Sequence, residues 1–138
     1  MNDLSWHDFF EIGVQFIDDD HKRLLSIMLN TRKAIEEGDN KKCVQLLTSL
    51  LKEANDHFER EEKYLLEVKY PELEEHKKYH RELLVQVETT KRICEGIETE
   101  HDLSKCFDGM ARFLIDDILK GDINFKSYLQ YEGYVKDL

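Results

Sequence analysis

The stretch that decides the fold is HFEREEKYLLEVKYPELEEHKKYH, residues 57–80. It contains two pairs of potential metal ligands at helical spacing, His57 with Glu61 and His76 with His80. Residues four apart lie above one another on an α-helix, so the members of each pair point the same way and can hold one ion. One such pair is a weak signal in a charged, helix-forming sequence. Two pairs on consecutive helices favour a metal site between the helices.

Apolar residues recur at spacings of three and four along most of the chain, and only one proline and six glycines interrupt them. This periodicity is typical of amphipathic helices and predicts an all-α protein. The helices are predicted at about residues 18–37, 40–66, 71–95 and 103–120. We therefore predict an antiparallel up-down-up-down four-helix bundle that forms a single domain over residues 1–138, with an N-terminal arm at 1–17 and a C-terminal tail at 123–138.

The predicted helix ends rest on residues that cap or stop helices. Asp18 or Asp19 can cap the first helix, and Gly38 can end it. Asp39 and Asn40 can cap the second helix, and Pro71 fits the first turn of the third.

The inner faces of the predicted helices are apolar but carry side chains of the kind that bind metals. His21 lies in the inner stripe of the first helix, Glu61 in that of the second, and Asp117 in that of the fourth. An ionised carboxylate in such a stripe is costly, on the order of several kcal/mol, unless it is paired or bound to metal. The alternative for Asp117 is that the helix ends near Gly121 and the carboxylate reaches water. Asp122 reaches the same face only if the helix continues or loosens across Gly121.

Composition excludes several classes of function. The chain has 138 residues, enough for one domain with its own core, and a net charge of -10 without a basic cluster, so nucleic acid and anionic membranes are poor partners. No apolar stretch is long enough to span a bilayer, and the N-terminus lacks the features of a signal peptide, which predicts a cytoplasmic protein. Cys43, Cys94 and Cys106 form no CxxC motif and are predicted to be reduced packing residues.

Two segments carry a family resemblance that covers essentially the whole chain. Residues 4–21, LSWHDFFEIGVQFIDDDH, resemble the opening arm of the hemerythrins, with the tryptophan, the Gly-Val pair and the Ile-Asp before the first ligand histidine. Residues 57–80 have the HxxxE, the Tyr-Pro turn and the HxxxH of that family in register. The chain therefore resembles single-domain bacterial hemerythrins. The resemblance implies an antiparallel four-helix bundle that holds two non-haem irons bridged by two carboxylates and an oxo or hydroxo oxygen.

The resemblance also implies roles for individual residues. His21 and His57 would hold the iron that has the open position, and His76 and His80 would hold the other iron. Glu61 and Asp122 would bridge the two irons.

One position departs from the family pattern. The family has a histidine five residues before the last bridging aspartate, and this chain has Asp117 there. A carboxylate in place of an imidazole lowers the net positive charge of the centre by one, which favours the ferric state and makes manganese or mixed occupancy more plausible. His101 offers no substitute, because it lies more than four helical turns from the site at a rise of ~1.5 Å per residue.

Three functions of different kinds follow from these observations. The leading prediction is a protein that binds dioxygen at a di-iron centre for carriage, storage or sensing, with a ligand set that favours the diferric state. The second is a di-iron peroxidase or oxidase that reduces peroxide or dioxygen. The third is a bundle that has lost metal binding and acts as an interaction module, but its core-facing histidines and Glu61 would then be buried without compensation. A redox or signalling partner cannot be identified from the sequence.

The remaining expectations concern the apolar and aromatic residues. Leu24, Met28, Phe58 and Leu114, with Phe113, are expected either to keep water from the open iron or to be ordinary core. The resemblance implies that Trp6 and Phe9, with Phe10, pack the arm across the bundle. The tail is expected to fold back on the bundle or to meet a partner through its near-helical series of apolar residues: Phe125, Tyr128, Leu129, Tyr131 and Tyr134.

Overall fold

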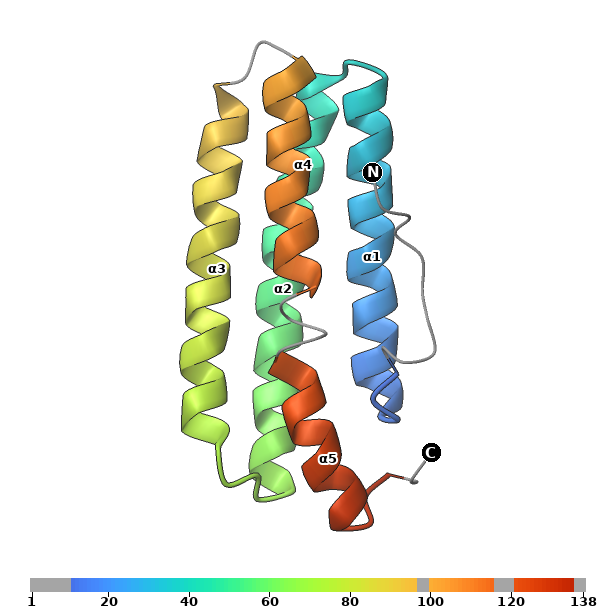
Figure 1. The fold of residues 1–138 in the computed structure, drawn as a ribbon, viewed down its shortest axis with the longest axis vertical. Helices are drawn as coiled ribbons and strands as arrows, with labels where there is room; N and C mark the ends of the chain where they lie inside the picture. Colours follow the sequence, from blue (N-terminus) through green and yellow to red (C-terminus); the bar gives the residue numbers. More distant parts are fainter. Residues whose placement is uncertain (1–10, 97–99, 116–120, 136–138) are drawn as a thin grey trace.

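The computed structural model describes residues 11–96, 100–115 and 121–135, and Figure 1 shows four helices that run alternately up and down. They are α1 (Gln15–Glu36), α2 (Asn40–Glu67), α3 (Leu73–Glu95) and α4 (Glu100–Ile115), followed by the shorter α5 (Ile123–Tyr131). Around the bundle, α1 packs on α2, α2 on α3, α3 on α4 and α4 on α1. The prediction of an all-α, antiparallel four-helix bundle is confirmed. Among the described residues, none of the helices is long and apolar enough to cross a membrane.

The start of α1 differs from the prediction. The helix begins at Gln15, and Val14, its N-cap, makes no hydrogen bond through its side chain. Asp18 lies inside the helix, and its carboxylate accepts hydrogen bonds from the backbone N–H groups of Ile12 (2.8 Å) and Gly13 (3.1 Å). The prediction that Asp18 or Asp19 caps the helix is therefore wrong, because Asp18 reaches back to hold the preceding segment.

Other helix ends follow the sequence more closely. Gly38 has a φ of +72°, a conformation that costs glycine little, and its N–H donates to the carbonyl of Ile35 to end α1. The carboxylate of Asp39 accepts the N–H of Lys42 at 3.0 Å and caps α2. Pro71 lies in the turn before α3, which begins two residues later than predicted.

The core consists of two apolar clusters. The first, which we call the long cluster, runs along the bundle and contains Leu24, Leu25, Met28, Ala34, Ile35, Cys43, Leu47, Leu50, Ala54, Phe58, Leu83, Val87, Phe107 and Leu114. The second, the end cluster, lies where the residues before α1, the turn between α2 and α3, and α5 meet; it contains Ile12, Ile17, Leu65, Val68, Tyr70, Leu73, Phe125 and Leu129. In the first half of α2 the fully buried positions are Cys43, Leu47 and Leu50.

A layer of polar side chains separates the two clusters. On α1, His21 lies between Ile17 of the end cluster and Leu24 of the long cluster. On α2, Glu61 lies between Phe58 and Leu65 in the same way. The candidate site therefore lies between the two apolar clusters.

The structure describes the predicted C-terminal tail as far as residue 135. Phe125 and Leu129 of α5 are fully buried, so α5 folds onto the bundle, while Tyr131 and Tyr134 are exposed. Several other expectations fall outside what the structure describes: those for Trp6, Phe9, Phe10, Asp117 and the predicted helix end at 120, and those for the side chains of Cys94, His101, Cys106 and Phe113.

Candidate metal centre

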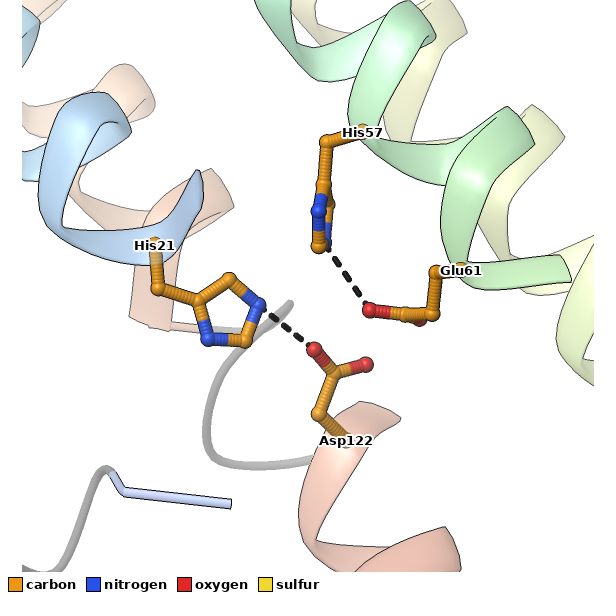
Figure 2. A group of neighbouring side chains, drawn as sticks. All are labelled: His21, His57, Glu61 and Asp122. Carbon is orange, nitrogen blue, oxygen red and sulfur yellow. Dashed lines mark ion pairs between the residues drawn. The ribbon is translucent and has the colours of Figure 1, made fainter. Parts of the chain in front are cut away.

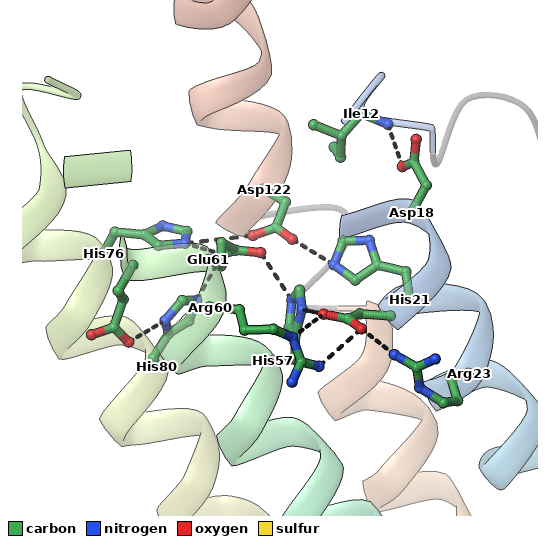
Figure 3. Close-up of polar contacts among 12 residues, drawn as sticks. Ile12, Asp18, His21, Arg23, His57, Arg60, Glu61, His76, His80 and Asp122 are labelled. Carbon is green, nitrogen blue, oxygen red and sulfur yellow. Dashed lines mark hydrogen bonds and ion pairs between the residues drawn. The ribbon is translucent and has the colours of Figure 1, made fainter. Parts of the chain in front are cut away.

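Six of the seven predicted site residues come together in the polar layer (Figures 2 and 3). All six are buried: His21, His57, Glu61, His76, His80 and Asp122. The seventh, Asp117, lies outside the described residues. Asp122 directly precedes α5, and Gly121 and Asp122 lie in a π-helical turn. This loosened turn is the kind of local geometry that brings Asp122 into register with the site.

The first half of the site joins α1, α2 and Asp122. Nε2 of His21 lies 2.6 Å from Oδ2 of Asp122, and Nε2 of His57 lies 2.9 Å from Oε2 of Glu61 (Figure 2). Neither histidine has measurable solvent exposure. This half of the site is closed to solvent.

The second half adds the two histidines of α3. Nε2 of His76 lies 2.6 Å from Oε1 of Glu61 and 3.5 Å from Oδ1 of Asp122. Nε2 of His80 lies 3.1 Å from the same Glu61 oxygen. Glu61 and Asp122 therefore each contact histidines of both halves.

The donor atoms have the arrangement that metal ions need. Two groups of residues, His21, His57, Glu61 and Asp122 on one side and Glu61, His76, His80 and Asp122 on the other, each offer ligand atoms that lie within 4.8 Å of one another. Although the contacts are short, Nε2 of His80, Oε2 of Glu61 and both Asp122 oxygens have no well-aligned hydrogen-bond partner among the described residues. Buried polar atoms are rarely left in this state. Imidazole nitrogens with bridging carboxylates are a ligand set that suits iron, so the residues fit a di-iron centre.

In the absence of a metal ion, the site holds paired opposite charges. Burial alone would raise the pKa of Glu61, but the charge and close contact of His57, together with His76 and His80, hold that pKa well below its usual 4.5. Burial would lower the pKa of His76, but Asp122 and Glu61 raise it to about 10. Burial would likewise lower the pKa of His80, but Glu61 and Glu62 raise it to about 9. Metal ions must displace protons from these histidines, so metal binding releases protons.

Two carboxylates beside the ligands were not predicted from the sequence. Asp20 accepts a hydrogen bond from Nδ1 of His57 at 3.0 Å, and Glu62 accepts one from Nδ1 of His80 at 2.8 Å. Burial would raise the pKa of Asp20, but hydrogen bonds from His57 and Arg60 outweigh burial and lower it. Glu62 carries a sequence signal, since it lies four residues after the buried Phe58 and so at the edge of the inner stripe. Asp20 carries none, because its partner is 37 residues away.

Apolar side chains surround the centre as expected. Leu24, Met28, Phe58 and Leu114 are all buried in the long cluster. The ring of Phe58 stacks on that of His80, with centroids 3.8 Å apart and planes 10° from parallel. Phe58 therefore restrains the orientation of a candidate ligand, beyond filling space.

A cavity of about 230 Å³ borders the second half of the site. Its lining consists of Tyr70, Glu72, Glu75, His76, Tyr79, Gly121 and Asn124. Gly121 is required at this wall, because a Cβ there would lie 2.6 Å from Cε2 of Tyr79. The two halves of the site therefore differ in their access to solvent.

The fold and the site place this protein in the class of four-helix bundles that carry a candidate two-metal site between their helices. The family model described as "Hemerythrin HHE cation binding domain" matches residues 12–120. The chain belongs to the hemerythrin family, a family of non-haem di-iron proteins that bind oxygen.

Named relatives agree with this assignment. A bacteriohemerythrin of Clostridium acetobutylicum is 28% identical over 116 residues, which cover 80% of this chain and 85% of that protein. A myohemerythrin of Theromyzon tessulatum is 31% identical over 98 residues, 70% of this chain and 73% of the relative. A bacteriohemerythrin of Pseudomonas aeruginosa is 25% identical over 126 residues, 91% of this chain and 80% of the relative.

Proposed function

We propose that this protein binds dioxygen reversibly at a di-iron centre. The observation that carries the proposal is the convergence of two histidine pairs, one from each half of the site, on two shared carboxylates. The irons, when bound, would supply the electrons that dioxygen takes up on binding and returns on release. The chain would supply the ligands for them: His21, His57, Glu61, His76, His80 and Asp122.

The surroundings of the ligands favour binding over turnover. His21 and His57 lie in the closed half, against the apolar long cluster that contains Leu24 and Met28. An apolar, water-poor site excludes side reactions and suits a small apolar ligand such as dioxygen. The resemblance assigns the open position to the iron in this half.

Asp117 is proposed as a seventh ligand that shifts the centre toward the diferric state. Its carboxylate would add negative charge to the second half of the site, which contains His76 and His80, and would lower the reduction potential of the di-iron centre. We expect faster oxidation to the diferric form than in a variant with histidine at this position. The same added oxygen ligand supports manganese or mixed occupancy as an alternative to two irons. The proposed location, the cytoplasm, rests on the sequence alone.

The test begins with anaerobic loading of the protein with ferrous iron and a count of iron per chain. Dioxygen is then admitted while the visible absorption is followed, and removed again by degassing. We expect two irons per chain and an absorption band that disappears on degassing. The Asp117→His variant should oxidise irreversibly more slowly; an unchanged rate would refute the role given to Asp117.

The same experiment separates the alternatives. Immediate, irreversible conversion to a diferric spectrum, followed by turnover with peroxide, would identify a peroxidase or oxidase. A chain that takes up no iron would identify an interaction module and would refute the proposal.

A further inference from the structure

In each half of the site, one candidate ligand is a histidine whose second ring nitrogen is hydrogen-bonded to a carboxylate outside the ligand set. Nε2 of His57 lies 2.9 Å from Glu61, and Nδ1 of the same ring lies 3.0 Å from Asp20. Nε2 of His80 lies 3.1 Å from Glu61, and Nδ1 of that ring lies 2.8 Å from Glu62. In both, the two ring nitrogens point in opposite directions, one into the site and the other to a carboxylate outside it.

This arrangement selects one form of each imidazole. A carboxylate beside Nδ1 favours the tautomer that carries its proton there, which leaves the lone pair of Nε2 for a metal ion. The negative charge of the carboxylate beside Nδ1 also makes Nε2 more basic and so a stronger ligand for a metal ion. Neither effect requires contact between the carboxylate and the metal.

The two acceptors differ in their surroundings. Asp20 is 4% exposed and is itself paired with two guanidinium groups: Arg60 lies 2.9 Å from Oδ1 and 3.1 Å from Oδ2, and Arg23 also contacts Oδ1. Figure 3 shows Arg60 next to His57, with Arg23 reaching in from α1. Glu62 is 24% exposed, and among the described residues no lysine or arginine pairs with it. The arginines offset the charge that His57 experiences, whereas His80 experiences the charge of Glu62 more fully.

We propose that Asp20 and Glu62 are positioning residues of the metal centre, one for each ion, and that Glu62 is the stronger electron-donating partner. Asp20 acts mainly by holding His57 in place, because the arginines fix its carboxylate and neutralise it. Glu62 acts mainly through its charge. The inference rests on the proposed function and assigns parts of the chain that the six candidate ligands do not include.

The test uses variants that keep side-chain shape and remove charge. Asp20→Asn and Glu62→Gln are compared with Asp19→Asn and Glu59→Gln, which alter exposed carboxylates on the same two helices. Affinity is measured with Co²⁺, followed by its visible absorption, and the midpoint potential is measured on the iron-loaded protein. The melting temperature of the metal-free protein is recorded for every variant.

We expect Asp20→Asn and Glu62→Gln to weaken Co²⁺ binding by roughly 10- to 100-fold, the usual effect of losing such a partner. The controls should stay within about twofold, since exposed carboxylates act only through screened long-range charge. The midpoint potential should rise in both variants, and more in Glu62→Gln. A lower melting temperature with unchanged affinity and potential would indicate a merely structural role and would overturn the inference.

Three further outcomes keep the conclusions separate. Because Asp20 is buried, Asp20→Asn can fail to fold; Glu62→Gln, at a partly exposed position, then decides the inference on its own. If the unaltered protein binds neither Fe²⁺ nor Co²⁺, the proposed function fails and the inference fails with it. If it binds both ions and the variants bind them equally well, the inference alone fails.

Discussion

The two halves of the candidate metal centre contain the same types of potential ligand but lie in different surroundings. His21 and His57 are sealed from solvent. In the other half, His76 lies beside a cavity that carries two further carboxylates, Glu72 and Glu75. The difference shows that ligand identity does not fix the properties of such a centre, because the local dielectric and the access of water are set by residues around the ligands.

The comparison also separates two routes into the centre. Polar solutes and protons have a direct path to His76 through the cavity. In the closed half, His57 meets the polar surface through Asp20 and its partly exposed partners Arg23 and Arg60, while His21 lies next to the apolar long cluster. The following experiments break this asymmetry or measure it.

The largest effect is expected from Glu61→Gln, which removes the carboxylate that both halves share. Three histidines lose one of their two carboxylate partners at once: His57, His76 and His80. We expect bound iron to fall from two ions per chain to less than one. At pH 6, the free energy of unfolding of the metal-free protein should fall by roughly 3–5 kcal/mol, the usual cost of breaking a buried ion pair. Iron analysis and urea unfolding measure both, with Glu59→Gln as the control; retention of two irons would contradict the shared role of Glu61.

A smaller effect, confined to the half of the site that borders the cavity, is expected from Gly121→Ala. The new Cβ would meet the ring of Tyr79 at 2.6 Å and lie 3.7 Å from Cε1 of His76. Overpacking of this kind costs about 1–3 kcal/mol. Gly109→Ala is the matched control, because its Cβ would meet Thr90 at an ordinary 3.4 Å, and a helical glycine replaced by alanine should gain up to about 1 kcal/mol. Urea unfolding of both variants measures the difference, and equal stabilities would show that the wall beside His76 is not tightly packed.

A further effect is the pH dependence of the metal-free protein. The raised pKa values of His76 and His80, about 10 and about 9 against 6.5 when unperturbed, contribute stability that is complete below pH 6.5 and is lost as pH rises through 9 to 10. The lowered pKa of Glu61 contributes stability that is present above pH 4.5 and is lost as pH falls through the lowered value. We therefore expect the highest melting temperature, measured with a chelator present, between pH 4.5 and 6.5.

Metal affinity should show the opposite trend, because the same histidines must lose protons to bind an ion. Affinity should rise from pH 6 to pH 8 while the metal-free protein becomes less stable. His80→Gln should reduce the loss of stability at high pH. A melting temperature that does not change between pH 6 and pH 10 would contradict the pairing of protonated His76 and His80 with their carboxylates.

The sequence was sufficient for the bundle and for the meeting of six candidate ligands, because both depend on helical periodicity. It was insufficient where a contact joins distant segments. Asp18 looked like a helix cap, but the structure shows it holding the backbone of Ile12 and Gly13, a contact that spacing alone cannot indicate. Asp20 was missed because its partner, His57, is 37 residues away, so that its local pattern is that of any of the thirty acidic residues of the chain. Glu62 could have been found, since it lies four residues after the buried Phe58 and so at the edge of the inner stripe.

The polar layer has a consequence for how the molecule opens. Because it interrupts the apolar core, the bundle contains two smaller cores in series. In the described part of the chain, continuous helices, paired charges and ring contacts of His76 and His80 join the two. The end cluster, which includes α5 and the turn before α3, is then the smaller cooperative unit and the one that can unfold locally while the rest stays folded. Ions that bridge Glu61 to Asp122 would tie this unit to the long cluster. Exchange of buried amide hydrogens in α5 would then depend on metal content.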